Sequence, residues 1–567
     1  ERRGPPSRLG QALGALGRTY ALQGDFEQAL PFLRRAFEVA SAAHADADAA
    51  LLAGNVAEAH IELRQWDEAA RFNDNATRIS GAGGATKPVW YTLNAAKIAQ
   101  GRGNYDEAGH LYESALSASA DEPIVRWNAN AGLAHLAIAN HDDKHAAEYF
   151  ERTLQIIEQT RSGLLKTDYK LSYLNNLIQF YHEYVDALIA QGQPDHALEV
   201  ADSSRGRVLA ERQRTASPDR VSAAGLRRIA EQSGQVMLFY WLQPKASWLW
   251  VVTARDIHLL PIPAGDQIEA LVREHQQMIG STLADPLASG ATPGDKLYSA
   301  LVAPAAPWIP SGASLLVVPD GALHSLNFET LPVAGPKRHY LIEDAAIQIV
   351  PSLGLLRRQT SAPTVSSLLL IGSPTVSDQK FPALRYASLE MARVAQHFNS
   401  SRIVSYEGAR ASPAAYRNAA PDRFSMIHFT AHAAASVESP LDSAVILAAE
   451  AGGYKLYARD IADVPLHADL VTVSACRSAG ERTYSGEGLI GFAWAFLRAG
   501  AKRVVAGLWD VDDRSTADLM DGLYARIAAG LPPARALREA KIAMLRAGGS
   551  LAKPYYWGPF EIFTVSP

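Results

Sequence analysis

The sequence predicts an N-terminal all-α solenoid followed by an α/β sandwich with a mainly parallel central sheet. From about residue 8 to residue 215, apolar residues recur at helical spacing. Around residues 212–222 this pattern dissolves into a polar stretch with a proline, which indicates a domain boundary. After the boundary, short β-rich runs alternate with helical stretches, as in a parallel sheet covered by helices. We therefore divide the chain into residues 1–215 and 216–567.

A short motif recurs through the helical region. It reads GDFEQAL at 24–30, RQWDEAA at 64–70 and GNYDEAG at 103–109, so its aromatic residues are about forty positions apart. A fourth copy between Asn140 and Leu154 lacks the aromatic residue, and a fifth reads GQPDHAL at 192–198. The motif resembles the tetratricopeptide repeat (TPR), which turns the chain between two antiparallel helices. Stacked hairpins leave a concave groove for a peptide or partner, and a generic helical bundle is the alternative.

The second region carries the pattern of buried strands separated by helices. Two helical stretches are expected, at residues 384–398 and 488–501. The alternation predicts a central sheet whose strands are mainly parallel. The expected strands are residues 236–241, 248–252, 315–318, 368–371, 470–473 and 504–508.

Composition excludes some partners and favours one compartment. A net charge of -5 over 567 residues gives no support for a nucleic-acid partner or an anionic membrane surface. No apolar run reaches the roughly 18 residues that span a bilayer. The only cysteine cannot form an intrachain disulfide, so we expect a cytoplasmic protein. The first residues carry no signal pattern and no initiator Met, which is typical of a trimmed product.

Two residues at the ends of predicted strands have the chemistry of a nucleophile and its base. His432 follows the strand-like run at 424–429, and Cys476 follows the run at 470–473. Because the carboxyl ends of parallel strands meet at one edge of a sheet, we expect these side chains to lie together. A nearby imidazole accepts the thiol proton, and the thiolate is the nucleophile. The backbone N–H groups of Ala433 and Cys476 are candidate donors to an oxyanion.

Less specific interpretations exist for each of these residues. A lone cysteine after a buried strand is often an inert core residue. His428 and His432 are too far apart along a strand, at roughly 13 Å, to share a metal ion, so we expect no metal and no cofactor. His428 is interpreted as a packing residue, and His324 as a structural residue of a loop.

Several motifs after residue 225 together resemble the CHAT domain, a caspase-like peptidase domain often found behind tetratricopeptide repeats. They follow one another in the order typical of that family. The motifs are VPDGALH at 318–324, IHFTAH at 427–432, SPLDSA at 439–444, ADL at 468–470, SAC at 474–476, GEG at 486–488, AFLRAGA at 495–501 and LWDVDD at 508–513.

The resemblance implies a three-layer α/β caspase-haemoglobinase-like fold and a catalytic dyad of His432 and Cys476. It also implies a pseudo-protease-like part at 216–360 and a catalytic part at 361–567. The family often has glycine where this chain has Ala433, and a methyl group there restricts φ and crowds the approach of a substrate backbone.

The resemblance further implies a regulated cysteine endopeptidase that cleaves a specific protein in bacterial defence or programmed cell death. The repeat groove is expected to bind a regulatory protein or ligand, or to recruit the substrate. The alternative is an inactive CHAT-fold scaffold that acts through protein interactions. For substrate binding, we consider Asp510, Asp512 and Asp513, which resemble a separase motif and favour a basic side chain, and the uncharged Ser474. These aspartates are equally interpreted as caps of a helix beginning near Ser515.

Overall fold

The computed structural model describes the chain as two compact units, Glu1–Tyr169 and Lys170–Pro567. The residues outside the description are 1–5, 23, 84–87, 121, 164–166, 213–219, 283, 336, 357–366, 377, 379, 437–438, 476–477, 479–481, 485–487, 511 and 567.

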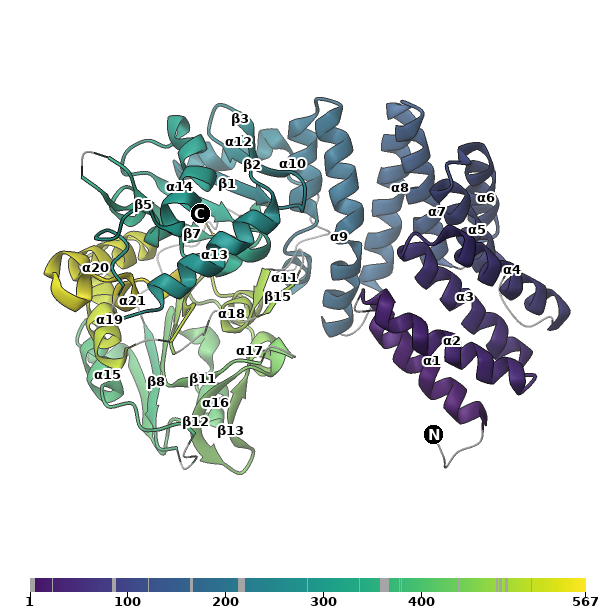
Figure 1. Ribbon diagram of the computed structural model, residues 1–567. Coiled ribbons are helices and arrows are strands. Elements are labelled where there is room, and N and C mark those ends of the chain that lie inside the picture. Colours follow the sequence, from purple (N-terminus) through teal and green to yellow (C-terminus); the bar gives the residue numbers. More distant parts are fainter. Residues whose placement is uncertain are drawn as a thin grey trace. The chain divides into compact units, whose positions relative to one another are not determined.

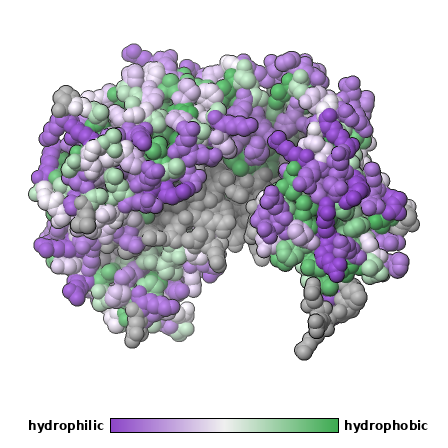
Figure 2. Space-filling model, in the orientation of Figure 1, coloured by the Kyte–Doolittle hydropathy of each residue, from purple (hydrophilic) through white to green (hydrophobic). Residues whose placement is uncertain are grey.

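The first unit consists of antiparallel helical hairpins (Figure 1). Consecutive helices pack face to face through alanines and aromatic rings, and the hydrophilic and hydrophobic residues on their surface are interspersed (Figure 2). The helices are α1 (Pro6–Leu22), α2 (Phe26–Ala42), α3 (Asp46–Glu62), α4 (Trp66–Gly83), α5 (Pro88–Gly101), α6 (Tyr105–Ser117), α7 (Pro123–Ala139) and α8 (Asp143–Ser162), with α9 (Thr167–Ala190) starting at the end of the unit.

The recurring motif forms the turn within each hairpin. Gly24 and Gly103 have φ angles of 80° and 82°, a left-handed conformation that glycine adopts without steric cost. Arg64 and His141 occupy the same place in their turns with a φ of 55° each. The aromatic residue of the motif then begins the second helix, so the predicted repeat pattern is confirmed as helical hairpins.

The second unit begins within α9, before the boundary expected at residue 215. Its first helices are α10 (Pro194–Ser203), α11 (Arg207–Arg212) and α12 (Ala223–Ser233). Asp202 accepts hydrogen bonds from the backbone N–H groups of Leu353 and Gly354, and the Trp250 indole donates to the carbonyl of Pro194. These helices therefore pack with the sheet, although their sequence continues the helical spacing of the repeats.

Within the described residues, the second unit is built on an eleven-stranded sheet. Its order is β3-β2-β1-β4-β7-β18-β17-β14-β10-β8-β9. All six predicted strands are present. The strands are β1 (Val236–Trp241), β2 (Ser247–Val252), β3 (Ile257–Ile262), β4 (Ser314–Val318), β7 (Ala346–Ile349), β8 (Leu368–Pro374), β9 (Ile403–Gly408), β10 (Met426–Thr430), β14 (Leu470–Ser474), β17 (Arg503–Gly507) and β18 (Phe560–Thr564).

The parallel strands form two groups that run in opposite directions. β1, β4, β7 and β18 are parallel neighbours, and so are β17, β14, β10, β8 and β9. The two groups meet at the antiparallel pair of β17 and β18. Their carboxyl ends therefore lie at opposite edges of the sheet.

Smaller sheets flank the central sheet. β11 (His432–Ala434) pairs with β12 (Ala444–Glu450), which pairs with β13 (Gly453–Tyr457). β15 (Arg482–Tyr484) pairs with β16 (Gly488–Ile490), and β5 (Pro332–Val333) with β6 (His339–Tyr340). The helix predicted at 488–501 begins only at Phe492, because Gly488 and Gly491 are weak helix formers and the first residues pair as β16 instead.

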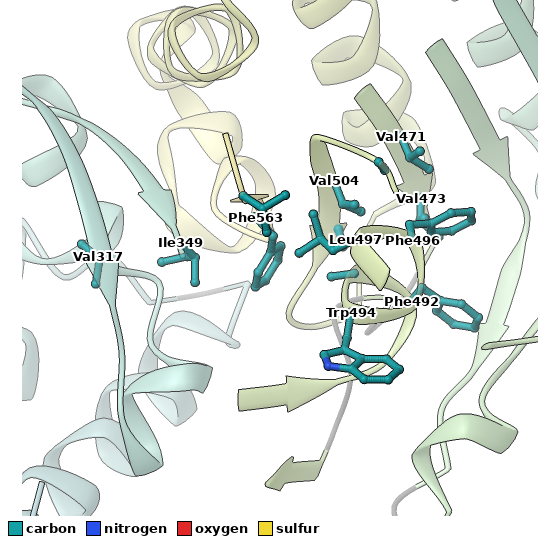
Figure 3. Close-up of a cluster of buried hydrophobic side chains, with 14 of the residues drawn as sticks. Val317, Ile349, Val471, Val473, Phe492, Trp494, Phe496, Leu497, Val504 and Phe563 are labelled. Atoms are coloured by element: carbon teal, nitrogen blue, oxygen red, sulfur yellow. The ribbon is translucent and has the colours of Figure 1, made fainter. Parts of the chain in front are cut away.

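Helices cover both faces of the sheet (Figure 1). On one face Val471, Val473 and Val504 pack against Phe492 and Phe496 (Figure 3). The helices on this face are α11, α13 (Gly265–Ile279), α14 (Pro293–Leu301), α16 (Pro413–Asn418), α17 (Ala458–Asp463) and α18 (Phe492–Ala499). Those on the other face are α15 (Ala387–Ala395), α19 (Asp513–Ala528), α20 (Pro533–Ala547) and α21 (Pro554–Trp557). The predicted fold class, helical repeats followed by an α/β domain with a mainly parallel sheet, is confirmed.

Candidate functional site

Two neighbouring strands, β10 and β14, carry the chain to the candidate site. They pair in parallel, and Thr430 at the end of β10 lies opposite Ser474 at the end of β14. These are the residues two positions before His432 and two positions before Cys476. The expectation that both strands end at one edge of the sheet is confirmed. Cys476 itself lies outside the described residues.

The His432 imidazole is held by a neighbouring loop. Its Nε2 atom lies 2.6 Å from the carbonyl oxygen of Pro382, and its ring is 5.7 Å from the ring of Phe381. A carbonyl oxygen only accepts hydrogen bonds, so the proton of the neutral imidazole lies on Nε2. Nδ1 is therefore the basic nitrogen. The loop between β8 and α15 thus fixes which atom of His432 can accept a proton.

Asp513 holds the far end of the same loop. Its carboxylate accepts a hydrogen bond of 2.9 Å from the backbone N–H of Tyr386, just before α15. Burial raises the pKa of Asp513, and the hydrogen bond from Tyr386 offsets part of this effect. Asp513 therefore anchors the loop that contacts His432.

The other predicted substrate-binding residues occupy different environments. Asp512 is the N-cap of α19 and accepts from the backbone N–H of Ser515 at 2.8 Å, as in the capping interpretation. Asp510 is exposed, whereas Ser474 is buried at the end of β14. Their role in substrate binding stays a prediction.

Ala433 lies beside His432 in the short strand β11, opposite Val445 of β12. An extended strand conformation is open to alanine, so the methyl group causes no backbone strain here. The role of the Ala433 N–H as an oxyanion donor stays a prediction.

The two other histidines weighed in the sequence lie away from the Pro382 contact. His324 follows β4, and burial, followed by the nearby charge of Arg205, lowers its pKa to about 4. His428 is fully buried and lies 2.8 Å from a carboxylate oxygen of Glu390. The Pro382 and Glu390 contacts were not predicted, because they join segments separated by 50 and 38 residues without any motif of charge or spacing.

Comparisons with known proteins agree with this architecture. Residues 291–565 match the CHAT domain family, and residues 10–35 match a tetratricopeptide repeat family. Tetratricopeptide repeat protein 28 of Mus musculus is 29% identical over 107 residues, which are 19% of this chain and 4% of that protein.

Solved structures resemble the chain at low sequence identity. A chain of the Saccharomyces cerevisiae separase-securin complex aligns with 99% of this chain and 47% of its own length, at 10% identity and a TM-score of 0.53, which shows the fold alone. BtubC (BKLC) from P. vanneervenii aligns with 37% of this chain and 84% of its own length, at 20% identity and a TM-score of 0.29. The chain thus spans less than half of the separase-complex chain and a small part of its curated relative. With a tetratricopeptide repeat match before a CHAT domain match, and a fold similar to that of a chain of the separase-securin complex, the chain has a TPR–CHAT architecture.

Proposed function

We propose that this chain is a regulated cysteine endopeptidase in which His432 is the base and Cys476 the nucleophile. The observation that carries the proposal is the parallel register of β10 and β14, with Thr430 opposite Ser474. Each strand ends two residues before a member of the dyad. The carbonyl of Pro382 supports the role of His432, because it leaves Nδ1 free of the proton that Nε2 carries.

The proposed reaction is hydrolysis of a peptide bond in two steps. Nδ1 of His432 takes the thiol proton, and the thiolate of Cys476 attacks the substrate carbonyl carbon. The tetrahedral intermediate collapses when the imidazolium returns this proton to the leaving amine nitrogen, which leaves a thioester. A water molecule then gives one proton to Nδ1 while its oxygen attacks the thioester carbon. The carbon–sulfur bond breaks, the imidazolium returns its proton to the Cys476 thiolate, and the released acid loses its remaining proton to solvent.

Two backbone N–H groups, those of Ala433 and Cys476, are proposed to stabilise the oxyanion of each tetrahedral intermediate. The extended conformation of β11 supports the first assignment, because alanine fits there without strain. A basic side chain before the cleaved bond is the proposed preference, with Asp510 as the exposed carboxylate of the three aspartates.

The helical repeats are proposed to control this activity. Tetratricopeptide repeats are protein-interaction modules, so the partner is a protein. A partner that prefers the aligned dyad would shift the population toward it. Bacterial defence or programmed cell death is the proposed setting, and the cytoplasm is the proposed compartment because the chain has a single cysteine. No helix of the described residues is long and apolar enough to cross a membrane.

The test is a comparison of protein N-termini in cells that express the wild-type chain or the Cys476→Ala variant. We expect a small set of new N-termini with the wild-type chain that Cys476→Ala and His432→Ala each abolish. A scaffold without peptidase activity would give the same N-termini in all three. Deleting residues 1–215 and assaying a short fluorogenic peptide derived from the cleaved site then tests control by the repeats, because a short peptide needs no recruitment.

A further inference from the structure

A fully buried acid–base pair lies directly before the candidate site. Glu390 of α15 and His428 of β10 are 1% and 0% exposed, and Glu390 Oε1 lies 2.8 Å from His428 Nε2. Thr430, also buried, donates its hydroxyl proton to the same carboxylate oxygen at 3.1 Å. Burying such groups is costly unless every member is hydrogen-bonded, so the pair strongly defines where α15 lies on β10.

The contacts of the pair determine its net charge. The Tyr524 hydroxyl donates to Thr472 of β14 at 3.0 Å, so its oxygen accepts from His428 Nδ1 at 3.2 Å. Nδ1 therefore carries a proton. The contact between Nε2 and the Glu390 carboxylate needs one further proton, on either atom. The pair is neutral overall in both cases, which is the state that a buried site tolerates.

This network fixes the α15 end of the loop that holds His432. Glu390 lies one turn inside α15, and the loop before this helix contains Pro382, whose carbonyl contacts Nε2 of His432. Between Pro382 and Glu390 in the sequence, the backbone N–H of Tyr386 donates a hydrogen bond to Asp513 of α19. Tyr524 of the same helix α19 reaches His428. The helices α15 and α19 are thus tied to β10 and β14, the two strands that lead to the proposed dyad.

From these contacts we infer that Glu390 and His428 are positioning residues for the His432 imidazole. They fix α15, and through it the Pro382 carbonyl, so that Nε2 of His432 carries the proton and Nδ1 is left to accept one. The inference rests on the proposed function, because it assigns the pair to the dyad of His432 and Cys476. Neither residue touches substrate.

The single cysteine allows a test without any substrate. The rate of alkylation by iodoacetamide follows the thiolate fraction, and an aligned imidazolium lowers the pH at which the thiolate forms. The rate is measured against pH for the full-length wild-type chain, His432→Ala, Glu390→Ala and Glu390→Gln. Asp521→Ala is the matched control, because Asp521 of α19 also binds a histidine next to α15, His397 at 2.7 Å, but at the opposite end of that helix from the loop.

We expect Glu390→Ala to raise the midpoint of the profile toward about 8.5, the value of a free thiol, and to slow alkylation at pH 6.5 about tenfold. Glu390→Gln keeps the shape of the side chain, and its amide can donate to His428 Nε2 although the Thr430 hydroxyl then loses its acceptor, so it should restore part of the rate. Asp521→Ala should leave the midpoint where it is in the wild type. A Glu390→Ala midpoint equal to that of the wild type would overturn the inference, and so would an equal shift in Asp521→Ala.

Two further results complete the test. If Glu390→Ala does not fold, Tyr524→Phe removes only the hydroxyl that holds His428, and it should raise the midpoint by a smaller amount. No shift in a folded Tyr524→Phe would then overturn the inference. If His432→Ala has the same profile as the wild type, the dyad itself is contradicted and the inference falls with it. A shift in His432→Ala without one in Glu390→Ala refutes the inference alone.

Discussion

The two oppositely directed groups of parallel strands each carry a histidine just beyond a strand, and the two histidines differ in every contact. His324 follows β4 in the first group, where burial and then Arg205 lower its pKa to about 4. His432 follows β10 in the second group, where its Nε2 meets the carbonyl of Pro382. The first stays neutral and enclosed beside a cation. The second has its tautomer fixed and Nδ1 as its basic atom.

The comparison shows that the neighbours of a histidine after a parallel strand decide whether it can act as a base. Arg205 donates to the carbonyls of Pro319 and Tyr240 and pairs with Asp320 at 3.1 Å, so this cation is held in place near His324. A cation next to an imidazole disfavours the imidazolium that a base must become. A backbone carbonyl accepts the Nε2 proton of either the neutral or the charged ring, so this contact is compatible with both states.

Replacing each of the two histidines in turn should give the largest difference in activity between them. His432→Ala should lower kcat for a cleaved peptide by about 10²- to 10⁴-fold, the usual contribution of general acid–base catalysis. His324→Gln should keep kcat within about twofold, because His324 takes no part in proton transfer in the proposed reaction. Initial rates on the same peptide measure both. Equal losses in the two variants would contradict the distinction.

Removing Arg205 should have the largest effect on stability. The side chain is almost fully buried, and Arg205→Ala leaves two carbonyls without a donor and Asp320 without its cation. We expect a loss of about 3–5 kcal/mol in the free energy of unfolding, measured by urea titration. The exposed Arg255 provides a control, and Arg255→Ala should change stability by less than about 0.5 kcal/mol. A loss below about 1 kcal/mol for Arg205→Ala would show that the cluster contributes little.

Acidification should weaken the region around His324. Its pKa is lowered from 6.5 to about 4 in the folded chain, so between these values the unfolded chain binds a proton that the folded chain does not. The contribution of His324 to the free energy of unfolding is therefore fully present above pH 6.5. It is lost as the pH drops toward 4, by on the order of 1–3 kcal/mol for one histidine. Unfolding titrations across this range measure the slope, and His324→Gln should reduce it. Burial also lowers the pKa of His275 to about 4, so His275 contributes to the slope in the same direction. It is unchanged in His324→Gln and should account for slope that remains in that variant.

The smallest expected effect concerns the aspartates after β17. Asp512→Ala removes an N-cap and should cost about 1 kcal/mol, measured by thermal unfolding. Asp510→Asn should reduce cleavage after basic residues more than after neutral ones. Specificity lost in Asp512→Ala and kept in Asp510→Asn would reverse the roles assigned to them.

Much of the fold follows from local patterns. Strands such as β1 are continuous apolar runs, and the turns that begin at Gly24 and Gly103 show the glycine that favours a left-handed conformation. The opposite directions of the two strand groups do not follow from local patterns, because they depend on β18. This strand comes from the end of the chain and inserts between β7 and β17. Nothing local to β18 specifies its neighbours.

The site was predicted in part for the same reason. His432 stands out because a strand precedes it and a known motif contains it. Its hydrogen-bond partner is a main-chain carbonyl, which any residue at position 382 would offer. The Glu390 carboxylate lies on an ordinary amphipathic helix, and its burial against His428 depends on how α15 packs on β10. The spacing of residues along the sequence does not predict this packing.

The most direct test of the dyad is the distance between Nδ1 of His432 and Sγ of Cys476 in a crystal structure of the chain bound covalently to a peptidyl chloromethyl ketone. The proposed mechanism predicts a single adduct on Cys476, with Nδ1 within about 4 Å of the sulfur and Nε2 still on the Pro382 carbonyl. An ordered site with the imidazole turned away from the adduct, or an inhibitor bound to another residue, would contradict it.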